Sequence, residues 1–518
     1  MQGDVVLLCR CQGRIARSLP VDELCSSLRQ DGTEVAITDD LCEPGAVSPL
    51  VKKNSHRPVA IGACETLRKR GSSLGLGPAT PVVDVLSETK APYSKAALVA
   101  RAKLLLCAQI ERCRDSFVPE EALRLDFSRP QGEITRRQLF RLPIPKSTLV
   151  PYVNVTKCTG KENCHLCQEA CPSDAIEFER GKALIDKTDC SGCGACVARC
   201  PYDAIGYPTF SLEEREREMK GLLLANDLLE PRMLAVMCRT CVSQSESKPD
   251  YPETMLPLEL PCLAMASPWL LLRAFDLGVQ GLALLTDECR SGLDSGRWQG
   301  NVKFVQEVLA QLGIEPARLQ VIRGDDGKEL CQFAREVAQL GPAFLRFAPP
   351  VAHSADEWRL PTLIKGMGEK LRRSFNGTVS AGDVPFGKVE IDGSRCTGCG
   401  LCAPDCPTGA LSFSSREQGT YEVMFWQQAC PGCGHCVNSC PEGCLRLEKR
   451  LELSCLSEPP VGLLRDETAR CRECGTLVAP QAMLVGLRQK LSGSGKDVSY
   501  LDLCPNCRVG SRLGLVRS

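Results

Sequence analysis

Residues 396–407 read CTGCGLCAPDCP, and a near copy, CPGCGHCVNSCP, follows at residues 430–441. Two earlier runs have the same character: CTGKENCHLCQEACP at 158–172 and CSGCGACVARCP at 190–201. Each run has three closely spaced cysteines and a fourth that directly precedes a proline. Glycines between the cysteines allow the tight turns that would wrap the backbone around a metal core. Four repeats of this spacing indicate that metal–thiolate chemistry decides the fold of two segments.

This spacing is the bacterial ferredoxin pattern, in which three close cysteines hold one 4Fe–4S cubane and the fourth ligates the neighbouring cluster. The crossing rule predicts four ligand sets, which we name after their first-motif cysteine. The Cys158 set is Cys158, Cys164, Cys167 and Cys200; the Cys190 set is Cys190, Cys193, Cys196 and Cys171; the Cys396 set is Cys396, Cys399, Cys402 and Cys440; the Cys430 set is Cys430, Cys433, Cys436 and Cys406. Zinc also binds four thiolates, but this repeated spacing is atypical of zinc sites. We therefore expect ferredoxin-like modules over 151–210 and 387–450.

The composition limits the function further. The chain has 518 residues, 34 cysteines, four histidines and equal numbers of basic and acidic residues, 63 each. A balanced charge gives no general attraction to nucleic acid, so we expect no nucleic-acid partner. The first residues lack a secretory signal, and no stretch approaches the roughly 18 apolar residues of a membrane span. We expect a cytoplasmic protein without a membrane span, in which reduced thiols bind metals.

Residues 1–114 alternate β-rich runs, at 4–8, 34–38 and 58–62, with helix-like segments. This alternation predicts a parallel sheet. Each run is followed shortly by cysteine: Cys9 and Cys11, Cys42, and Cys64. Because the carboxyl ends of parallel strands meet at one edge, these thiols should converge there. The alternative is that they are ordinary buried core cysteines.

The runs CRCQG (9–13), LCEPG (41–45), GAC (62–64) and QIERC (109–113) resemble the N-terminal domain of heterodisulfide reductase A. The resemblance implies one further 4Fe–4S cluster on Cys11, Cys42, Cys64 and Cys113, with Cys9 competing for the place of Cys11. That family continues into a flavin-binding domain. No Gly-x-Gly-x-x-Gly run follows a strand here, so we expect no FAD or NAD site.

Residues 211–345 repeat the strand-then-cysteine pattern after an expected surface helix at 211–230. Strands expected at 233–237, 255–260 and 282–286 lead to Cys238 and Cys241, to Cys262 and to Cys289, and a fourth, at 319–323, lacks a cysteine. A redox-active dithiol on Cys238 and Cys241 is the alternative to a metal site.

The stretch also resembles the delta subunit of methyl-viologen-reducing hydrogenase. The residues that carry this likeness are CRTC (238–241), Cys262, Cys289, GNVK (300–303) and LGIEPARL (312–319). It implies a 2Fe–2S cluster on Cys238, Cys241, Cys262 and Cys289. Asp294 stands where that family tends to have another cysteine.

The tail, 451–518, contains paired knuckles whose four thiols predict a tetrahedral site: Cys471, Cys474, Cys504 and Cys507. Structural zinc is the simplest occupant, and rubredoxin-like iron is the alternative. The tail has little other core-forming sequence, so we expect the metal to hold it together. Segments 115–150 and 346–386 are expected to be linkers.

The expected fold is therefore a multidomain α/β and α+β protein with two small parallel-sheet domains, two ferredoxin-like modules and zinc-ribbon or rubredoxin-like knuckles. Six cysteines remain as structural residues: Cys9, Cys25, Cys107, Cys331, Cys444 and Cys455. The ligand sets predict about 22 iron atoms per chain.

Many clusters without a substrate site predict an electron-transfer subunit. It would relay single electrons between a catalytic dehydrogenase or hydrogenase and another redox partner. The resemblances imply a hydrogenase or a heterodisulfide reductase-like partner, and a formate dehydrogenase is a further possibility. A thiol–disulfide reductase with its own catalysis and an iron–sulfur scaffold for enzyme maturation remain as alternatives.

Overall fold

The computed structural model divides the chain into two compact units. Unit 1 is Met1–Cys158 with Leu166–Arg373, and unit 2 is Thr159–His165 with Ser374–Ser518. The structure describes residues 4–43, 45–71, 76–77, 79–88, 93–114, 118–126, 146–158, 164–224, 229–230, 232–239, 251–286, 297–324, 327–342, 359–372, 377–380, 382, 384–416, 419–457, 459–492 and 498–512.

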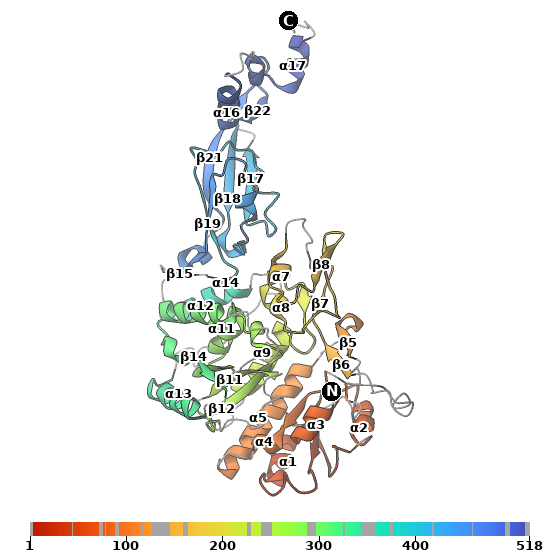
Figure 1. Cartoon of the computed structure of the whole chain (residues 1–518). Coiled ribbons are helices and arrows are strands. Elements are labelled where there is room, and N and C mark those ends of the chain that lie inside the picture. The colour runs from red at the N-terminus through yellow and green to blue at the C-terminus, as the bar shows by residue number, and fades with distance from the viewer. Residues whose placement is uncertain are drawn as a thin grey trace, which may run out of the picture. The chain divides into compact units, whose positions relative to one another are not determined.

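The first sheet of unit 1 has four parallel strands in the order β2-β1-β3-β4. Its helices α1 to α5 are labelled in the red-to-orange part of Figure 1. The strands are β1 (Val5–Cys9), β2 (Glu34–Thr38), β3 (Val59–Ala63) and β4 (Val82–Asp84), and the helices are α1 (Val21–Gln30), α2 (Val47–Lys53), α3 (Glu65–Arg70), α4 (Val85–Glu88) and α5 (Lys95–Cys113). Strands β1 and β3 lie at the centre and are fully buried, as continuous apolar strands of parallel sheets are. The three strands expected from the sequence are confirmed to within one residue.

The second sheet of unit 1 is also parallel, in the order β12-β11-β13-β14. Its strands are β11 (Met233–Cys238), β12 (Met255–Leu260), β13 (Gly281–Thr286) and β14 (Leu319–Arg323), and its helices are α9 (Leu212–Leu223), α11 (Pro268–Asp276), α12 (Arg297–Leu312), α13 (Gly327–Gln339) and α14 (Arg359–Lys370). The N-cap expected at Ser211 is confirmed: its side chain and that of Glu214 form a reciprocal capping box.

The two sheets have the same topology. If β11, β12, β13 and β14 are matched to β1, β2, β3 and β4, both sheets show the order second, first, third, fourth strand. In each, the first strand ends on a cysteine, Cys9 in β1 and Cys238 in β11. Unit 1 therefore contains the same parallel arrangement twice.

Helix α9 was expected on the surface and is instead largely buried. Its charged residues Glu214, Arg215, Glu216 and Glu218 are nearly inaccessible to solvent. The helix packs along α5. At this contact, a Cβ on Gly221 would stand 2.8 Å from the Cα of Ala108, so glycine is required for the close approach. Charged residues tolerate such burial only when they are paired and hydrogen-bonded.

The first ferredoxin module of unit 1 has short strands and helices around its cysteine loops. They are β7 (Tyr152–Val153), α7 (Leu166–Glu169), β8 (Ile176–Glu179), β9 (Lys182–Ile185), α8 (Ala195–Arg199) and β10 (Ile205–Gly206). Segments expected to be linkers contain regular structure. Strands β5 (Leu123–Asp126) and β6 (Lys146–Leu149) pair within 115–150. Helix α14 and strand β15 (Thr378–Ser380) lie within 346–386.

Unit 2 is built from antiparallel strands and the tail helices. The strands are β15, β16 (Lys388–Ile391), β17 (Leu411–Arg416), β18 (Thr420–Phe425), β19 (Leu445–Glu448), β20 (Arg450–Glu452), β21 (Val461–Arg470) and β22 (Leu477–Pro480), and the helices are α15 (His435–Asn438), α16 (Gln481–Ser492) and α17 (Pro505–Arg512). Strand β21 pairs with β18, so the tail continues the sheet of the second ferredoxin module. Sheet pairing therefore fixes the tail in addition to the predicted metal site, and the sequence had not indicated this pairing.

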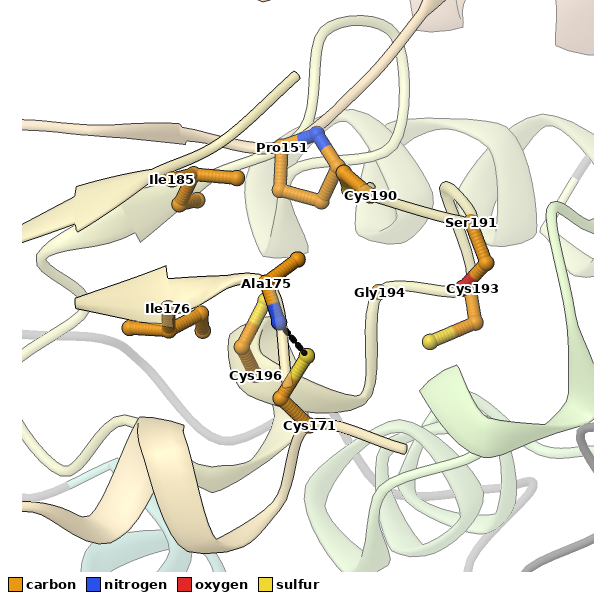
Figure 2. A pocket seen from close by; sticks show the side chains of 10 residues that line it. All are labelled: Pro151, Cys171, Ala175, Ile176, Ile185, Cys190, Ser191, Cys193, Gly194 and Cys196. Atoms are coloured by element: carbon orange, nitrogen blue, oxygen red, sulfur yellow. Dashed lines mark hydrogen bonds between the residues drawn. The ribbon is translucent and has the colours of Figure 1, made fainter. Parts of the chain in front are cut away.

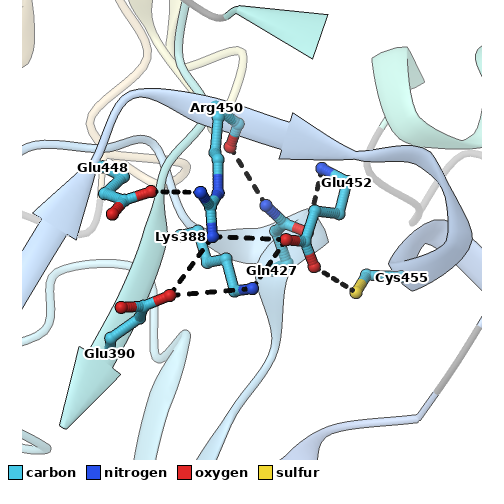
Figure 3. Close-up of polar contacts among 7 residues, drawn as sticks. All are labelled: Lys388, Glu390, Gln427, Glu448, Arg450, Glu452 and Cys455. Carbon is cyan, nitrogen blue, oxygen red and sulfur yellow. Dashed lines mark hydrogen bonds and ion pairs between the residues drawn. The ribbon is translucent and has the colours of Figure 1, made fainter. Parts of the chain in front are cut away.

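A charged network joins three strands of unit 2 (Figure 3). Arg450 pairs with Glu448 at 2.5 Å, Glu390 at 3.2 Å and Glu452 at 3.4 Å. Lys388 pairs with Glu452 at 2.6 Å. These groups lie on β16, β19 and β20, so the ion pairs link the three strands.

We predict that the buried ion pair between Arg101 on α5 and Glu88 contributes strongly to the stability of unit 1. The guanidinium of Arg101 is fully buried, lies 2.7 Å from Glu88, and donates to the carbonyls of Glu253 and Met255 at β12. Arg101→Met should lower the stability of unit 1 by about 3–5 kcal/mol, because it removes the buried cation that pairs with the Glu88 carboxylate and donates to two carbonyls. Denaturant unfolding followed by fluorescence measures the loss.

Lys69→Met is the matched control. Lys69 forms an exposed pair with Glu65 at 2.7 Å, and pairs of this kind contribute about 0.3–0.5 kcal/mol. Equal effects of the two substitutions would contradict the assigned role of Arg101.

Candidate metal centres

The Cys190 set lines a single cavity. All four thiols predicted by the crossing rule lie on its wall, with Ile176 and Ile185 (Figure 2). Gly194, whose φ is +72°, allows the loop to turn into α8. The backbone N–H of Ala175 donates to the Cys171 sulfur at 3.3 Å, and that of Gly192 to Cys190 at 3.4 Å. Such donors stabilise negative charge on cluster sulfurs.

The chemistry of this cavity fits a 4Fe–4S cluster. Burial raises the pKa of the Cys196 thiol well above its ordinary value, and the neighbouring thiols add to the rise. A bare thiolate is therefore unfavourable here. A cationic iron core would supply the missing charge, because metal coordination deprotonates a thiol outright.

Three of the four cysteines of the Cys158 set lie close by. Cys158, Cys167 and Cys200 share a small core with Cys196, Ile176 and Ile205. The backbone N–H of Ala204 donates to the Cys200 sulfur at 3.3 Å, the counterpart of the Ala175 bond to Cys171. The repeated bond shows that both cysteine–proline segments turn in the same way. Cys164 is half-buried and belongs to unit 2.

In unit 2, the Cys430 and Cys396 sets are held by equally close turns. Burial raises the pKa of Cys430 to about 12 and that of Cys402 to about 11. A Cβ on Gly387 would stand 3.3 Å from the Cys430 sulfur, so the backbone just before β16 passes directly against this loop. The ammonium of Lys449 donates to the carbonyl of Gly432. A fixed positive charge thus lies beside the Cys430 set.

Cys444 has a closer link to the clusters than the sequence indicated. We expected a structural filler, and the residue is indeed buried. Its sulfur, however, lies 3.4 Å from that of Cys440, a predicted ligand. One sign of this contact was visible in the sequence: Cys444, four residues after Cys440, stands where such motifs usually have alanine.

The second sheet of unit 1 brings Cys238 and Cys262 together at its carboxyl edge. Cys238 ends β11, Cys262 follows β12 by two residues, and Cys238 donates to the carbonyl of Pro261 at 3.3 Å. A hydrogen bond between the two thiols raises the pKa of Cys262. Cys241 and Cys289 lie outside the described residues.

This thiol pair adjoins the first ferredoxin module. The charge of Cys193 also acts on Cys262. A Cβ on Gly194 would stand 2.5 Å from the side chain of Met265, in the 3-10 turn Leu263–Met265 that follows Cys262. The loops of the two sites therefore pack so closely that position 194 has no room for a side chain.

Positive charge is concentrated near this junction. The guanidinium carbons of Arg112, Arg215 and Arg239 lie 5.6, 4.5 and 4.7 Å from the ring centroid of buried Phe210. Burial, together with the like charges of the other two arginines, lowers the pKa of Arg215 to about 10. Nearby carboxylates of Glu218 and Glu259 pair with Arg215 and Arg239. Anionic thiolate sites are favoured beside such buried cations.

The first sheet gathers a second group of thiols. The sulfurs of Cys9 and Cys11 are 3.3 Å apart, those of Cys42 and Cys64 are 3.2 Å apart, and Cys9, Cys11 and Cys42 all lie within 4.8 Å of one another. A hydrogen bond from Cys11 lowers the pKa of Cys9 to about 6 and that of Cys64 to about 4. The hydrogen bonds to Cys64 and Cys9 raise the pKa of Cys11, and burial raises that of Cys42 to about 12, so two of the four sulfurs favour the thiolate form and two do not.

The structure does not bring Cys113 to this group. Its neighbour Arg114 pairs with Asp4 at 3.0 Å, and Asp4 directly precedes β1. The other thiols lie beyond the opposite end of β1, about 16 Å along the strand. Cys113 instead interacts with the guanidinium of Arg112.

The tail brings four thiols into one close group. The sulfurs of Cys471, Cys474, Cys504 and Cys507 all lie within 4.8 Å of one another, and Cys471 and Cys504 share a small core with Leu503. Hydrogen bonding, first from the backbone of Cys504, lowers the pKa of Cys471 to about 6. Tetrahedral M–S bonds of about 2.3 Å put thiolates about 3.8 Å apart, so this spacing fits one metal ion.

Comparisons with known proteins agree with the geometry of unit 1 and unit 2. The family model of the 4Fe–4S dicluster domain matches residues 157–204 and 395–444. The model of the methyl-viologen-reducing hydrogenase delta subunit matches residues 233–341. Neither reaches residues 1–114, where the resemblance to heterodisulfide reductase A stays a prediction.

A 7Fe ferredoxin from Hydrogenibacillus schlegelii is 40% identical over 63 residues, which are 80% of that protein and 12% of this chain. Through these modules the chain belongs to the ferredoxin family. Ferredoxin-type electron transfer and 4Fe–4S cofactors follow from this membership. The rest of the chain, including both parallel sheets, lies outside that likeness.

Two relatives are components of larger oxidoreductases. The B component of an ion-translocating oxidoreductase complex from Methanosarcina acetivorans is 46% identical over 48 residues, 9% of this chain and 17% of that protein. The IorA component of an indolepyruvate oxidoreductase from Pyrococcus abyssi is 44% identical over 54 residues, 10% of this chain and 8% of that protein. The chain thus spans a small part of these relatives. Among the described residues, no helix is long and apolar enough to span a membrane.

We predict that Cys193→Ala removes one 4Fe–4S cluster. Iron per chain should fall by about four atoms, because three thiols cannot complete the four-cysteine shell. Iron and sulfide analysis of anaerobically purified protein measures the loss. Cys331→Ala is the control, since Cys331 is exposed on α13, and it should keep all iron. Equal iron in both variants would contradict the ligand assignment.

Proposed function

We propose that the chain is an electron-transfer subunit that relays single electrons between a catalytic dehydrogenase or hydrogenase and another redox partner. The observation that carries this proposal is the contact between Gly194, in the loop of the Cys190 set, and Met265, in the turn after Cys262. Two thiolate sites whose loops touch are suited to exchanging electrons directly.

When bound, iron–sulfur clusters take up and release one electron at a time. The protein's own residues exclude water and fix the surrounding charge. Ala175 and Gly192 donate backbone hydrogen bonds to the Cys190 set. These hydrogen bonds favour the more negative, reduced state of a cluster. The relay therefore needs no substrate pocket of its own.

The same proposal includes the cofactors. We assign a 2Fe–2S cluster to Cys238, Cys241, Cys262 and Cys289, and zinc to the tail. The match to the hydrogenase delta-subunit model and the single-ion spacing of the tail thiols support these assignments. A hydrogenase, a heterodisulfide reductase-like enzyme or a formate dehydrogenase is the proposed catalytic partner. The density of free thiols favours a reducing compartment, the cytoplasm.

We predict that reduced methyl viologen will reduce the 4Fe–4S signals and the 2Fe–2S signal of the second sheet reversibly, and that Cys262→Ala will remove that second-sheet signal and leave the 4Fe–4S signals in place. The remaining three thiols cannot complete that site, while the ferredoxin sets stay intact. EPR spectra and stopped-flow absorbance, compared with Cys331→Ala, measure the outcome.

Two results would contradict the relay. Transfer of iron from the reduced chain to an apo-ferredoxin, without reoxidation by an electron acceptor, would indicate a scaffold protein. Disulfide reduction that is lost on thiol alkylation while all clusters remain would indicate a thiol–disulfide reductase.

The tail gives a separate prediction. Purified protein should contain about one zinc atom per chain, and Cys504→Ala should lose it, because zinc sites of this kind need all four ligands. Elemental analysis measures zinc and iron together. Cys331→Ala should retain the zinc. A tail that holds iron instead, with the visible absorption of a ferric tetrathiolate, would overturn the zinc assignment.

A further inference from the structure

We infer that Cys444 tunes the cluster of the Cys396 set: its thiol donates a hydrogen bond to the ligand sulfur of Cys440 and so raises the reduction potential of that cluster. From the sequence, a structural filler was expected at this position. The inference deepens the relay proposed above, and it rests on that proposal and on the ligand set that the ferredoxin motif predicts.

Each cysteine–proline segment is followed by an equivalent position, four residues after the cysteine. Alanine stands there in three segments, as Ala175, Ala204 and Ala410, and cysteine stands there in the fourth, as Cys444. In two of the alanine segments, the backbone N–H of this residue donates to the sulfur of the preceding ligand, at 3.3 Å in both. The backbone N–H of Cys444 donates to the Cys440 sulfur in the same way. Cys444 therefore keeps the backbone donor of the motif and adds a side-chain donor.

Backbone hydrogen bonds fix the position of Cys444 beside the cysteine loop. Its carbonyl accepts from the N–H of Asp392 at 2.8 Å, and the carbonyl of Asp392 accepts from the N–H of Cys396 at 3.1 Å. The first module has the same two bonds around Ala175, at 2.9 and 3.0 Å. Because the backbone is held alike in both places, the sulfur of Cys444 lies where the other segments have the methyl group of alanine.

The sulfur of Cys444 lies against two predicted ligands. It is 3.4 Å from the sulfur of Cys440, and its thiol is also hydrogen-bonded to the side chain of Cys396. The side chain is buried, so water does not compete for the thiol proton. In a bound cluster Cys440 is a thiolate without a proton, and Cys444 is therefore the donor of the bond between them.

Cys440 completes the ligand set, and Cys444 lies behind it. The charges of Cys396, Cys399 and Cys440 all act on the thiol of Cys402, so these four sulfurs surround one place. A 4Fe–4S cubane binds one thiolate per iron, four in all. A fifth sulfur beside two of the ligands is thus left to form hydrogen bonds and not to coordinate iron.

A hydrogen bond to a ligand sulfur stabilises the more negative, reduced cluster and therefore raises its reduction potential. Reduction adds one electron to the cluster, and the proton stays on Cys444 in both oxidation states. No bond to iron forms or breaks in this step. The thiol therefore makes the Cys396 set hold its electron more strongly than the same set would with alanine at position 444.

The test compares Cys444→Ala with the unsubstituted full chain, both purified anaerobically. Alanine is the residue of the other three segments, so this variant should fold and keep all its iron. In a redox titration followed by EPR, we expect the midpoint potential of one 4Fe–4S signal to become more negative. Cys399→Ala breaks the same ligand set and identifies that signal by removing it.

Two further variants separate hydrogen bonding from packing. Cys444→Ser keeps a donor, so its potential should lie closer to that of the unsubstituted chain than the potential of Cys444→Ala does. Cys331→Ala, on the exposed side of α13, should leave every potential unchanged. If Cys444→Ala does not fold, Cys444→Val supplies a larger apolar side chain without a donor and should show the same negative shift.

Three results would overturn the inference. The first is an unchanged potential in Cys444→Ala. The second is an equal shift in Cys444→Ala and Cys444→Ser, which would indicate packing alone. The third is the loss of about four iron atoms in Cys444→Ala, which would make Cys444 a ligand. The potentials are measured without a redox partner, so a failure of the proposed relay is distinguishable from a failure of this inference.

Discussion

Parallel strand pairing is the constraint on which unit 1 depends. Parallel strands must all end at one edge, so residues that follow different strands meet there. In both sheets those residues are cysteines, drawn from segments far apart in the sequence. A compact group of thiols at such an edge is unfavourable as bare thiolate and favourable around a metal. Fold and cofactor therefore depend on each other.

Buried charge is the second theme. Arg101, Arg215, Arg273 and Arg318 are among the most buried side chains of the chain. Two of them link segments that are far apart in the sequence. Arg318 donates to the carbonyls of Gln280 and Gly341, and Arg101 donates to those of Glu253 and Met255. Arg215 and Arg273 instead pair with carboxylates, Arg215 with Glu218 and Arg273 with Glu216. These buried cations are therefore stabilised by counterions as well as by hydrogen bonds.

The sequence predicted the local features well. The expected strands of both sheets lay within one residue of their observed positions, because continuous apolar runs bounded by polar residues mark buried parallel strands. Cysteine spacing predicted the Cys190 set, which lines one cavity. Non-local features were missed. Strands β5 and β6 pair although they are well separated in the sequence. The charged residues of α9 predicted a surface helix, because the sequence does not show that Glu216 pairs with Arg273 and that Arg215 donates to the carbonyl of Glu259. Cys113 was misplaced because the sequence does not tell which sheet edge a helix end reaches.

The contact between Gly194 and Met265 has a consequence for the two ferredoxin modules. The equivalent glycine of the second module, Gly434, has only Leu447 near the place of a Cβ, at 3.8 Å. In the first module, a neighbouring turn requires glycine at this motif position. In the second module, the conformation of the loop itself requires it. The modules share a pattern, but they are not interchangeable parts. A chain with the two modules swapped would place Gly434 and His435 where Gly194 and Ala195 now stand, and the imidazole would have to find space beside a turn that is already filled.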